Sequence, residues 1–153
     1  LEVKTRGARS TTVKNRVEHE LAHRATLDRS ARRYADSALE SIGIEHPDEL
    51  ALVPTLITRY DRTTLFLESS LSRATIDTEL SWEGSDGEIM RRPDLVIIET
   101  KSGSRTSEID RLLWSWGHRP VTISKFGTGL AAIRPDLPSN KWARVLRRHF
   151  QGA

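Results

Sequence analysis

The sequence contains no cysteine, which excludes disulfide bonds, thiolate catalysis and zinc sites built on cysteine. It has no apolar run near the roughly 20 residues that a membrane-spanning helix needs. Its first residues also lack the charged and then apolar pattern of a signal peptide, and we find no repeat or low-complexity tract. We therefore expect a soluble chain, and the absence of cysteine is compatible with a reducing, cytoplasmic setting.

The charge of the chain is only slightly unbalanced. Lys and Arg together number 24 against 21 for Asp and Glu, and Arg outnumbers Lys by 19 to 5. An excess of Arg suits forked recognition of phosphate oxygens, although a GC-rich genome produces the same bias without functional pressure. The surplus is concentrated in residues 1–33. This distribution is consistent with an anionic partner and does not identify the anion.

A chain of 153 residues is long enough for one domain with a sizeable hydrophobic core and too short for two domains of typical size. We therefore predict a single folding unit over residues 1–153. The opening Leu1-Glu2-Val3-Lys4 begins directly in a strand pattern without Met, so we expect that an upstream segment is missing.

Hydrophobic periodicity predicts a mixture of helices and strands. Alternation and turn residues favour two short strands or one bent hairpin over residues 1–16. They favour strands over residues 55–68, 73–82, 95–98 and 120–126, with a loop over residues 83–93. Helical spacing favours helices over residues 27–42, 107–116 and from Ser139 onward, with Gly43 and Gly117 ending the first two. We interpret the run at residues 95–98 as a strand that is buried on both sides.

Charged side chains recur along one face of several predicted strands. In the predicted strand 73–82, simple alternation gives one charged face with Arg73, Thr75, Asp77 and Glu79. The other face is largely apolar, with Ala74, Ile76, Thr78 and Leu80. The same spacing pairs Glu2 with Lys4, Tyr60 with Arg62, and Glu99 with Lys101.

Two explanations fit these charged faces. They are typical of the solvated side of an antiparallel sheet. Alternatively, they line the polar interior of a barrel, where several cations need a polyanion as counter-charge and a carboxylate can hold a divalent cation that bridges phosphate oxygens. Glu99 and Lys101 favour the second explanation, because they directly follow an apolar run where unpaired charges would be costly.

Six short motifs occur in the order seen in a known family. They are Glu2-Val3-Lys4, Lys14-x-Arg16, Arg59-Tyr60-Asp61-Arg62, Arg73-Ala74-Thr75-Ile76-Asp77-Thr78, Glu99-Thr100-Lys101-Ser102 and Ser124-Lys125-Phe126-Gly127. With this set the chain resembles the C-terminal portion of the VTC domain, a branch of the triphosphate tunnel metalloenzymes of the CYTH-like superfamily. No single motif is diagnostic, but the ordered set spans nearly the whole chain.

The resemblance implies an α+β fold built on an antiparallel β-barrel, the triphosphate tunnel fold, with helices packed on the outside. It also implies an enzyme, a metal-dependent phosphotransferase that moves the γ-phosphoryl group of ATP onto a growing polyphosphate chain with Mn²⁺ or Mg²⁺. ATP and inorganic polyphosphate are then the expected partners. The resemblance further suggests a cytoplasmic protein held at the inner face of a membrane through a membrane protein partner, and no specific nucleic acid.

Carried over by position, the resemblance assigns roles to ten residues. The expected catalytic phosphate clamps are Lys4, Arg62, Arg73 and Lys125; the expected substrate-binding residues are Lys14, Arg16, Tyr60, Lys101 and Ser124; the expected metal ligand is Glu99. Asp77 serves the metal through water or orients Arg73. The five histidines are scattered, and we take them as surface or structural residues.

The chain departs from the family pattern at two places. No acidic first strand and no Arg-x-Arg strand precede Leu1, so we expect a barrel that is incomplete at its N-terminus and a chain that is catalytically weak alone. Phe126 stands where a Tyr is common, which removes a hydroxyl. Two alternatives to the polymerase stay open, an inorganic triphosphatase of the same fold and a non-catalytic module that binds polyphosphate or another polyanion.

Overall fold

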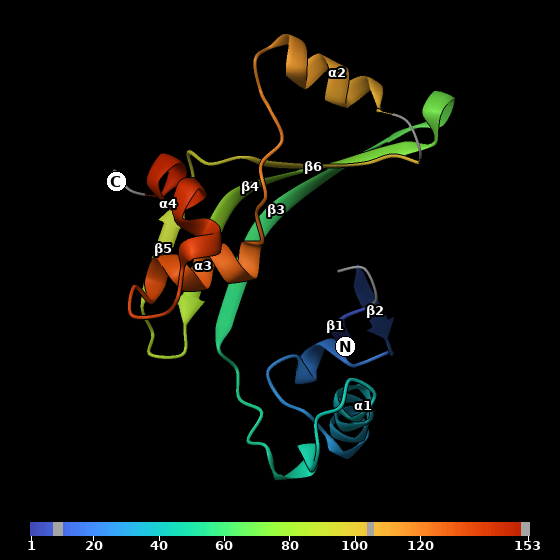
Figure 1. Ribbon diagram of the computed structural model, residues 1–153, viewed down its shortest axis with the longest axis vertical. Helices are drawn as coiled ribbons and strands as arrows, with labels where there is room; N and C mark the ends of the chain where they lie inside the picture. The colour runs from blue at the N-terminus through green and yellow to red at the C-terminus, as the bar shows by residue number, and fades with distance from the viewer. Residues whose placement is uncertain (8–10, 104–105, 151–153) are drawn as a thin grey trace. The chain divides into compact units, whose positions relative to one another are not determined.

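The computed structural model describes residues 1–7, 11–103 and 106–150. These residues form an α+β structure with antiparallel sheets and four α-helices (Figure 1). The chain divides into two compact units, Leu1–Pro54 and Thr55–Ala153, and each is described by itself. In the part of the chain that the structure describes, no helix has the length and apolar character needed to cross a bilayer.

Unit 1 consists of a two-stranded hairpin and one α-helix. Strands β1 (Glu2–Arg6) and β2 (Thr12–Arg16) pair antiparallel, which confirms the hairpin predicted from the sequence. Helix α1 (Arg29–Glu40) begins after Asp28, whose carboxylate accepts the backbone N–H of Ala31 at 2.8 Å. Gly43, at φ 86°, ends the helix as predicted, because a residue without a Cβ adopts this left-handed conformation at little cost.

Short connections complete unit 1. A 3₁₀ turn, η2 (Leu21–His23), lies between β2 and α1, and a second, η3 (Pro47–Glu49), follows the helix. Alanines on one side of α1 are buried, and Pro47 is buried with them. Arg32 connects the helix to η3, because its guanidinium pairs with Asp36 and also donates to the Pro47 carbonyl at 2.5 Å.

Unit 2 is organised around one long central strand. Strand β4 (Ser72–Gly84) pairs along most of its length with β3 (Leu56–Leu67), from which a 3₁₀ turn, η4 (Glu68–Ser70), separates it. Its other edge pairs with β5 (Ile89–Arg92) at one end and with β6 (Ile97–Lys101) at the other. All of these pairings are antiparallel, and the strands of the described residues do not close into a barrel.

A β-bulge changes which residues of β4 share a face. Arg59 pairs with Ser81 but Asp61 pairs with Thr78, so β4 carries one extra residue opposite Tyr60. Glu79 takes a left-handed conformation at φ 50° within this bulge. Simple alternation therefore fails beyond Thr78, and Leu80 lies on the face of Asp77 rather than on the opposite face. Leu80 and Ile97 belong to the same apolar cluster, and Ile97 is the register partner of Asp77.

The helices of unit 2 cover different parts of the sheet (Figure 1). Helix α2 (Glu108–Ser115) has the capping box Ser107–Asp110, and Asp110 accepts a hydrogen bond from Thr100 of β6 at 2.6 Å. Helix α3 (Lys125–Ile133) packs against β3 and β4, with α4 (Ala143–His149) and the 3₁₀ turn η5 (Asn140–Trp142) beside it. Thr100 pairs with Ala74, so α2 covers the face opposite Asp77, whereas α3 covers the apolar end of the Asp77 face.

The core of unit 2 forms where α3 meets the sheet. Trp82 is completely buried, and its indole N–H donates to the carbonyl of Lys125 at 2.9 Å. Helix α3 approaches the indole so closely that a Cβ on Gly129 would lie 2.1 Å from Cδ1 of Trp82. The glycine is therefore required by packing, and the indole hydrogen bond fixes the first turn of the helix against the sheet.

Three predictions of secondary structure need correction. Residues 83–93 include the strand β5 as well as a turn, so the loop prediction missed a strand. Residues 120–126 do not form a strand; Ser124 caps α3 through its hydroxyl, which accepts the N–H of Gly127. The run 95–98 is not buried on both sides, because Val96 and Ile98 are 49% and 40% exposed while Ile97 is buried.

Candidate functional site

The residues of unit 2 that were predicted to bind phosphate share one face of the sheet. Register pairs Arg62 with Asp77, Arg73 with Lys101, and Thr75 with Glu99. Directly paired residues of an antiparallel sheet point to the same side, and Arg73, Thr75 and Asp77 alternate along β4. Arg62, Arg73, Glu99 and Lys101 therefore lie on one face of β3, β4 and β6. We call it the charged face.

Asp77 lies at the centre of the charged face. Its side chain is 0% exposed, and both carboxylate oxygens accept hydrogen bonds from cations. Nε and Nη2 of Arg62 donate at 2.6 and 2.8 Å, and Nζ of Lys125 lies 2.6 Å from Oδ2. Asp77 thus orients Arg62 and Lys125, whereas the sequence had suggested Arg73 or a metal as its partner.

The ionisation of Asp77 follows from these contacts. Burial alone would raise the pKa of its carboxyl, but the hydrogen bonds from Arg62 and Lys125 outweigh burial and hold the pKa below its usual 3.8. The same hydrogen bond raises the pKa of Arg62, so the pair stays fully charged at neutral pH. A buried carboxylate between two cations is the arrangement in which burying charge is tolerated.

Tyr60 forms an aromatic wall beside the two cations. Cζ of Arg62 lies 4.8 Å from the centre of the Tyr60 ring, and Nζ of Lys125 lies 5.3 Å from it. Both distances are within the range of cation–π attraction. The bulge opposite Tyr60 and the first turn of α3 bring these three side chains together from β3 and α3. Ser124 precedes Lys125 and supplies the helix cap described above.

The rest of the charged face is more open. Lys101 pairs with Glu99 at 3.0 Å, and each side chain is about half exposed. Arg73 is exposed and makes no ion pair with the residues that the structure describes. Beside them, Thr75 is 9% exposed, and its hydroxyl has no hydrogen-bond partner in the described part of the chain. The face therefore offers Arg73 to a ligand, while the Thr75 hydroxyl lies buried beneath it.

Thr75 is the residue that sequence reasoning missed as a candidate. It stood on the predicted charged side of its strand, but nothing in the sequence indicated that its hydroxyl would be buried without a partner. The available signal was its position midway between Arg73 and Asp77. Its register partner Glu99 places it next to the expected metal ligand.

The other three predicted cations lie in unit 1. Lys4 of β1 stands directly opposite Lys14 of β2, and Glu2 stands opposite Arg16. Glu2 pairs with Lys4 at 3.1 Å and with the Arg16 guanidinium. The hydrogen bond from Arg16, followed by that from Lys4, lowers the pKa of Glu2 from 4.5 to about 2. Lys4, Lys14, Arg16 and Glu2 therefore share one face of the hairpin.

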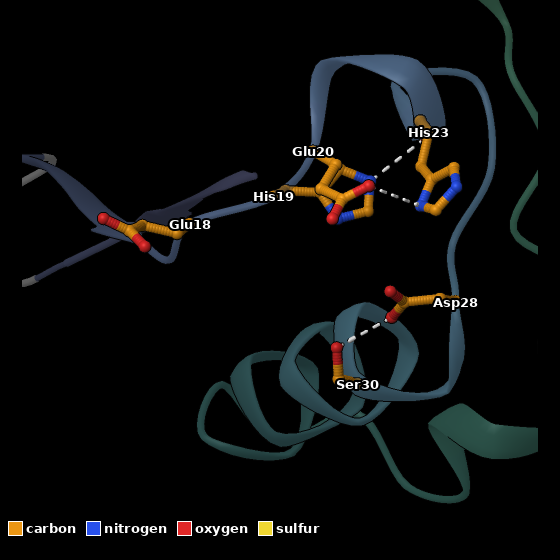
Figure 2. Close-up of a pocket in the computed structure, with 6 residues that line it drawn as sticks. All are labelled: Glu18, His19, Glu20, His23, Asp28 and Ser30. Carbon is orange, nitrogen blue, oxygen red and sulfur yellow. Dashed lines mark hydrogen bonds and ion pairs between the residues drawn. The ribbon is translucent and has the colours of Figure 1, made fainter.

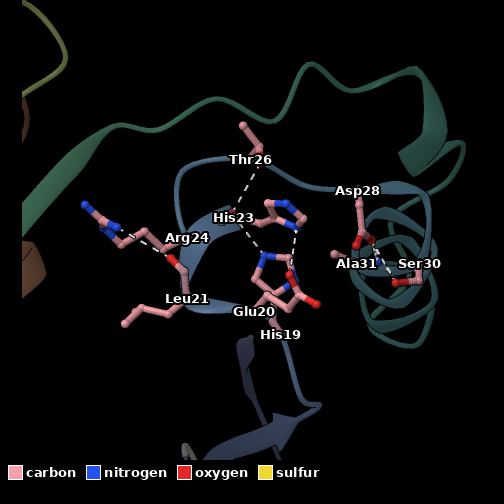
Figure 3. Close-up of polar contacts among 9 residues, drawn as sticks. All are labelled: His19, Glu20, Leu21, His23, Arg24, Thr26, Asp28, Ser30 and Ala31. Atoms are coloured by element: carbon pink, nitrogen blue, oxygen red, sulfur yellow. Dashed lines mark hydrogen bonds and ion pairs between the residues drawn. The ribbon is translucent and has the colours of Figure 1, made fainter.

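Unit 1 also contains a cavity of about 520 Å³ that differs in character from the charged face (Figure 2). Its lining is acidic and imidazole-rich: Glu18, His19, Glu20, His23, Asp28 and Ser30. Polar contacts join some of these residues: Nε2 of His19 lies 3.1 Å from the backbone carbonyl oxygen of His23, and Asp28 accepts from Ser30 and caps α1 (Figure 3). Three carboxylates would repel a polyanion, so this cavity is no phosphate site.

No cluster of three or more potential metal ligands of the His, Cys, Asp or Glu type occurs among the residues described here. A metal on the charged face would therefore rest on a single protein carboxylate. Asp77 is unsuitable, because both of its oxygens are occupied by cations. Glu99, half exposed beside Lys101, is the carboxylate of this face that can reach an ion.

Comparison with known proteins supplies one finding. The family described as the VTC domain matches residues 1–134. No curated protein and no solved structure shows a significant match to the chain. The matched range includes the hairpin, β3 to β6, α2 and α3, and thus all ten candidate residues.

Proposed function

The chain belongs to the VTC domain family, a polyphosphate polymerase-like family, and we propose that it transfers the γ-phosphoryl group of ATP to a growing polyphosphate chain with the help of a divalent metal. The observation that carries this proposal is the charged face, where Asp77 holds Arg62 and Lys125 side by side against Tyr60. Four cations and two carboxylates share this face, so it has a net positive charge without being a uniform basic patch.

Phosphoryl transfer asks the protein mainly for alignment and for stabilisation of charge on the transferred group. A set of fixed Arg and Lys side chains meets both demands without a covalent intermediate. In unit 2 we assign direct contact with the reacting phosphates to Arg62, Arg73 and Lys125, and binding of the remaining substrate to Tyr60, Lys101 and Ser124. For unit 1, the clamp role of Lys4 and the substrate-binding role of Lys14 and Arg16 remain predictions from the family resemblance.

Glu99 is the proposed metal ligand. Mg²⁺ and ions of similar preference are commonly held by one or two carboxylates together with substrate phosphates, so a single carboxylate fits this use. The bound ion would supply neutralisation of the negative charge on the phosphate oxygens. Lys101, at 3.0 Å from Glu99, orients the carboxylate and adds its own charge to the face.

Two alternative functions use the same residues. A triphosphatase would align water in place of the chain end, and a binding module would hold polyphosphate without turnover. ATP and inorganic polyphosphate are the proposed partners of the polymerase. A membrane protein partner and a cytoplasmic location at the inner face of a membrane remain predictions from the family resemblance.

A single assay separates these functions. The chain is incubated with ATP and Mn²⁺ or Mg²⁺, and with tripolyphosphate, and products are followed by ³¹P NMR and by gel electrophoresis of polymer. Polymer from ATP supports the polymerase, orthophosphate from tripolyphosphate supports the triphosphatase, and binding without turnover supports the module. Absence of all three overturns the proposal.

Matched variants assign any activity to the charged face. Arg73→Gln removes an exposed cation from this face and should reduce turnover by about a hundredfold, as loss of a charge-stabilising donor does elsewhere. Arg91→Gln removes an exposed cation from the opposite face, since Arg91 pairs with Ser81, and should change turnover less than about twofold. Equal effects of the two variants would indicate generic electrostatics.

A further inference from the structure

The role of Asp77 goes beyond providing a counter-charge. A site for a polyanion loses affinity for each carboxylate placed in it, yet the most buried side chain of the charged face is a carboxylate. It is not paired with one cation on the surface but is shared between one from β3 and one from the first turn of α3. This arrangement requires an explanation other than net charge.

Geometry suggests what Asp77 contributes. Arg62 and Lys125 carry like charges and long flexible side chains, so without an acceptor between them they would separate and sample several rotamers. With Asp77 in place, Arg62 donates to both carboxylate oxygens and Lys125 donates to Oδ2, and both cations contact the same aromatic ring. Each cation keeps further N–H donors for other acceptors.

Exposure shows that these remaining donors are accessible. The Arg62 side chain is 39% exposed and that of Lys125 is 18% exposed, whereas Asp77 is 0% exposed. The carboxylate therefore lies beneath the two cations, and a ligand on the face meets the cations first. Repulsion between Asp77 and a bound phosphate is reduced by the two cations that lie between them.

We propose that Asp77 is a positioning residue that holds Arg62 and Lys125 as a preorganised pair of donors for neighbouring phosphates of an extended phosphate chain. The proposal rests on the proposed function for the identity of the ligand. The proposal is distinguished from generic electrostatics by the direction in which Asp77→Asn changes the affinity for a polyanion. Asp77→Asn makes the site more positive by one charge, so generic electrostatics predicts tighter binding of a polyanion, whereas loss of positioning predicts weaker binding.

The binding test uses the full 153-residue chain and inorganic tripolyphosphate as the probe in calorimetry. We expect Asp77→Asn to raise Kd about tenfold. In this variant, binding must immobilise the side chains of Arg62 and Lys125, which Asp77 already positions in the wild type. Asp61→Asn is the matched control, since it makes the same charge change one residue from Arg62 but on the opposite face, where Asp61 pairs with Thr78. It should leave Kd within about twofold or lower it slightly.

A second readout follows the side chains in the free protein. The Arg62 Nε–H bonded to Asp77 should give a resolved, slowly exchanging NMR signal in the wild type and in Asp61→Asn, and should lose it in Asp77→Asn. Circular dichroism checks that the variants are folded. If Asp77→Asn does not fold, the wild-type measurement decides, because rapid exchange of this N–H there would overturn the inference.

The outcomes separate the inference from the proposed function. Tighter binding by Asp77→Asn than by the wild type would overturn the positioning role. Weaker binding together with loss of the Arg62 signal would support it. A wild type that shows the protected signal but does not bind tripolyphosphate would leave the positioning of the two cations standing and overturn the phosphate ligand.

Discussion

Each unit of the chain contains one carboxylate shared by two cations. In unit 1, Glu2 pairs with Lys4 and Arg16, whose side chains are 60% and 74% exposed. In unit 2, Asp77 pairs with Arg62 and Lys125, and its own side chain is fully buried. The chemistry is the same, but water screens the first group and is excluded from the second. The comparison teaches that burial, rather than the number of charges, decides which cations are held in place.

The largest expected difference between the two groups concerns stability. Asp77→Asn leaves two cations around a buried amide, and we expect it to lower the free energy of unfolding by about 2–3 kcal/mol, somewhat less than for a fully buried pair because both cations reach solvent. Glu2→Gln should change the melting temperature little. Chemical denaturation of both variants measures this, and equal destabilisation would remove the distinction drawn from burial.

Packing of α3 should matter almost as much as the carboxylate. Gly129→Ala places a methyl group into the Trp82 indole, so the helix must shift and carry Lys125 away from Asp77. We expect about 1–2 kcal/mol of destabilisation together with weaker tripolyphosphate binding. Gly103→Ala is the control, because a Cβ there would have no atom of the described residues within 4 Å. An unchanged affinity in Gly129→Ala would show that the position of α3 does not set the charged face.

Lowering the pH should remove the stabilisation by the Asp77 and Glu2 carboxylates over different pH ranges. Both carboxyl groups have a pKa lowered in the folded state, so each contributes stability that is present above its unfolded pKa and is lost as pH falls through the folded pKa. For Asp77 this loss begins below about 3.8, and for Glu2 it extends from 4.5 to about 2. Stability from these groups should therefore be constant between pH 7 and 5. Carboxyl NMR titration checks that both pKa values are lowered, and an Asp77 carboxyl that titrates above 3.8 would contradict the network.

The smallest effect is expected at Thr75. Thr75→Val keeps the shape of the side chain and removes a buried hydroxyl that has no partner within the described residues, so unfolding free energy should stay constant or rise by less than about 1 kcal/mol. If the hydroxyl contacts phosphate, the same variant weakens tripolyphosphate binding. Melting curves and calorimetry measure the two effects. Clear destabilisation would show that the Thr75 hydroxyl does donate or accept a hydrogen bond in the folded protein.

The sequence predicted the residues of the charged face better than it predicted the β-bulge and the helix α3 that position them. Tyr60, Arg62 and Asp77 lie on strands that local alternation identifies. The bulge at Glu79 could not be predicted from the sequence. Its left-handed conformation is usually adopted by Gly, Asn or Asp, and Glu79 is none of these. The strand predicted over residues 120–126 is instead a cap and a helix start, since Ser124 fulfils a capping role that its β-prone neighbours Val121 and Ile123 obscure. Lys125 therefore reaches Asp77 from a helix that sequence reasoning did not place there.

We propose that the charged face of unit 2, organised by Asp77, binds phosphate chains. The most direct test is an NMR titration of the ¹⁵N-labelled chain with inorganic tripolyphosphate, following the Arg Nε–H signals. We expect Arg62 and Arg73 to shift at the lowest ligand concentrations, before the solvent-facing Arg144 and Arg147 of α4. Uniform shifts of all arginines, or shifts confined to α4, would contradict it.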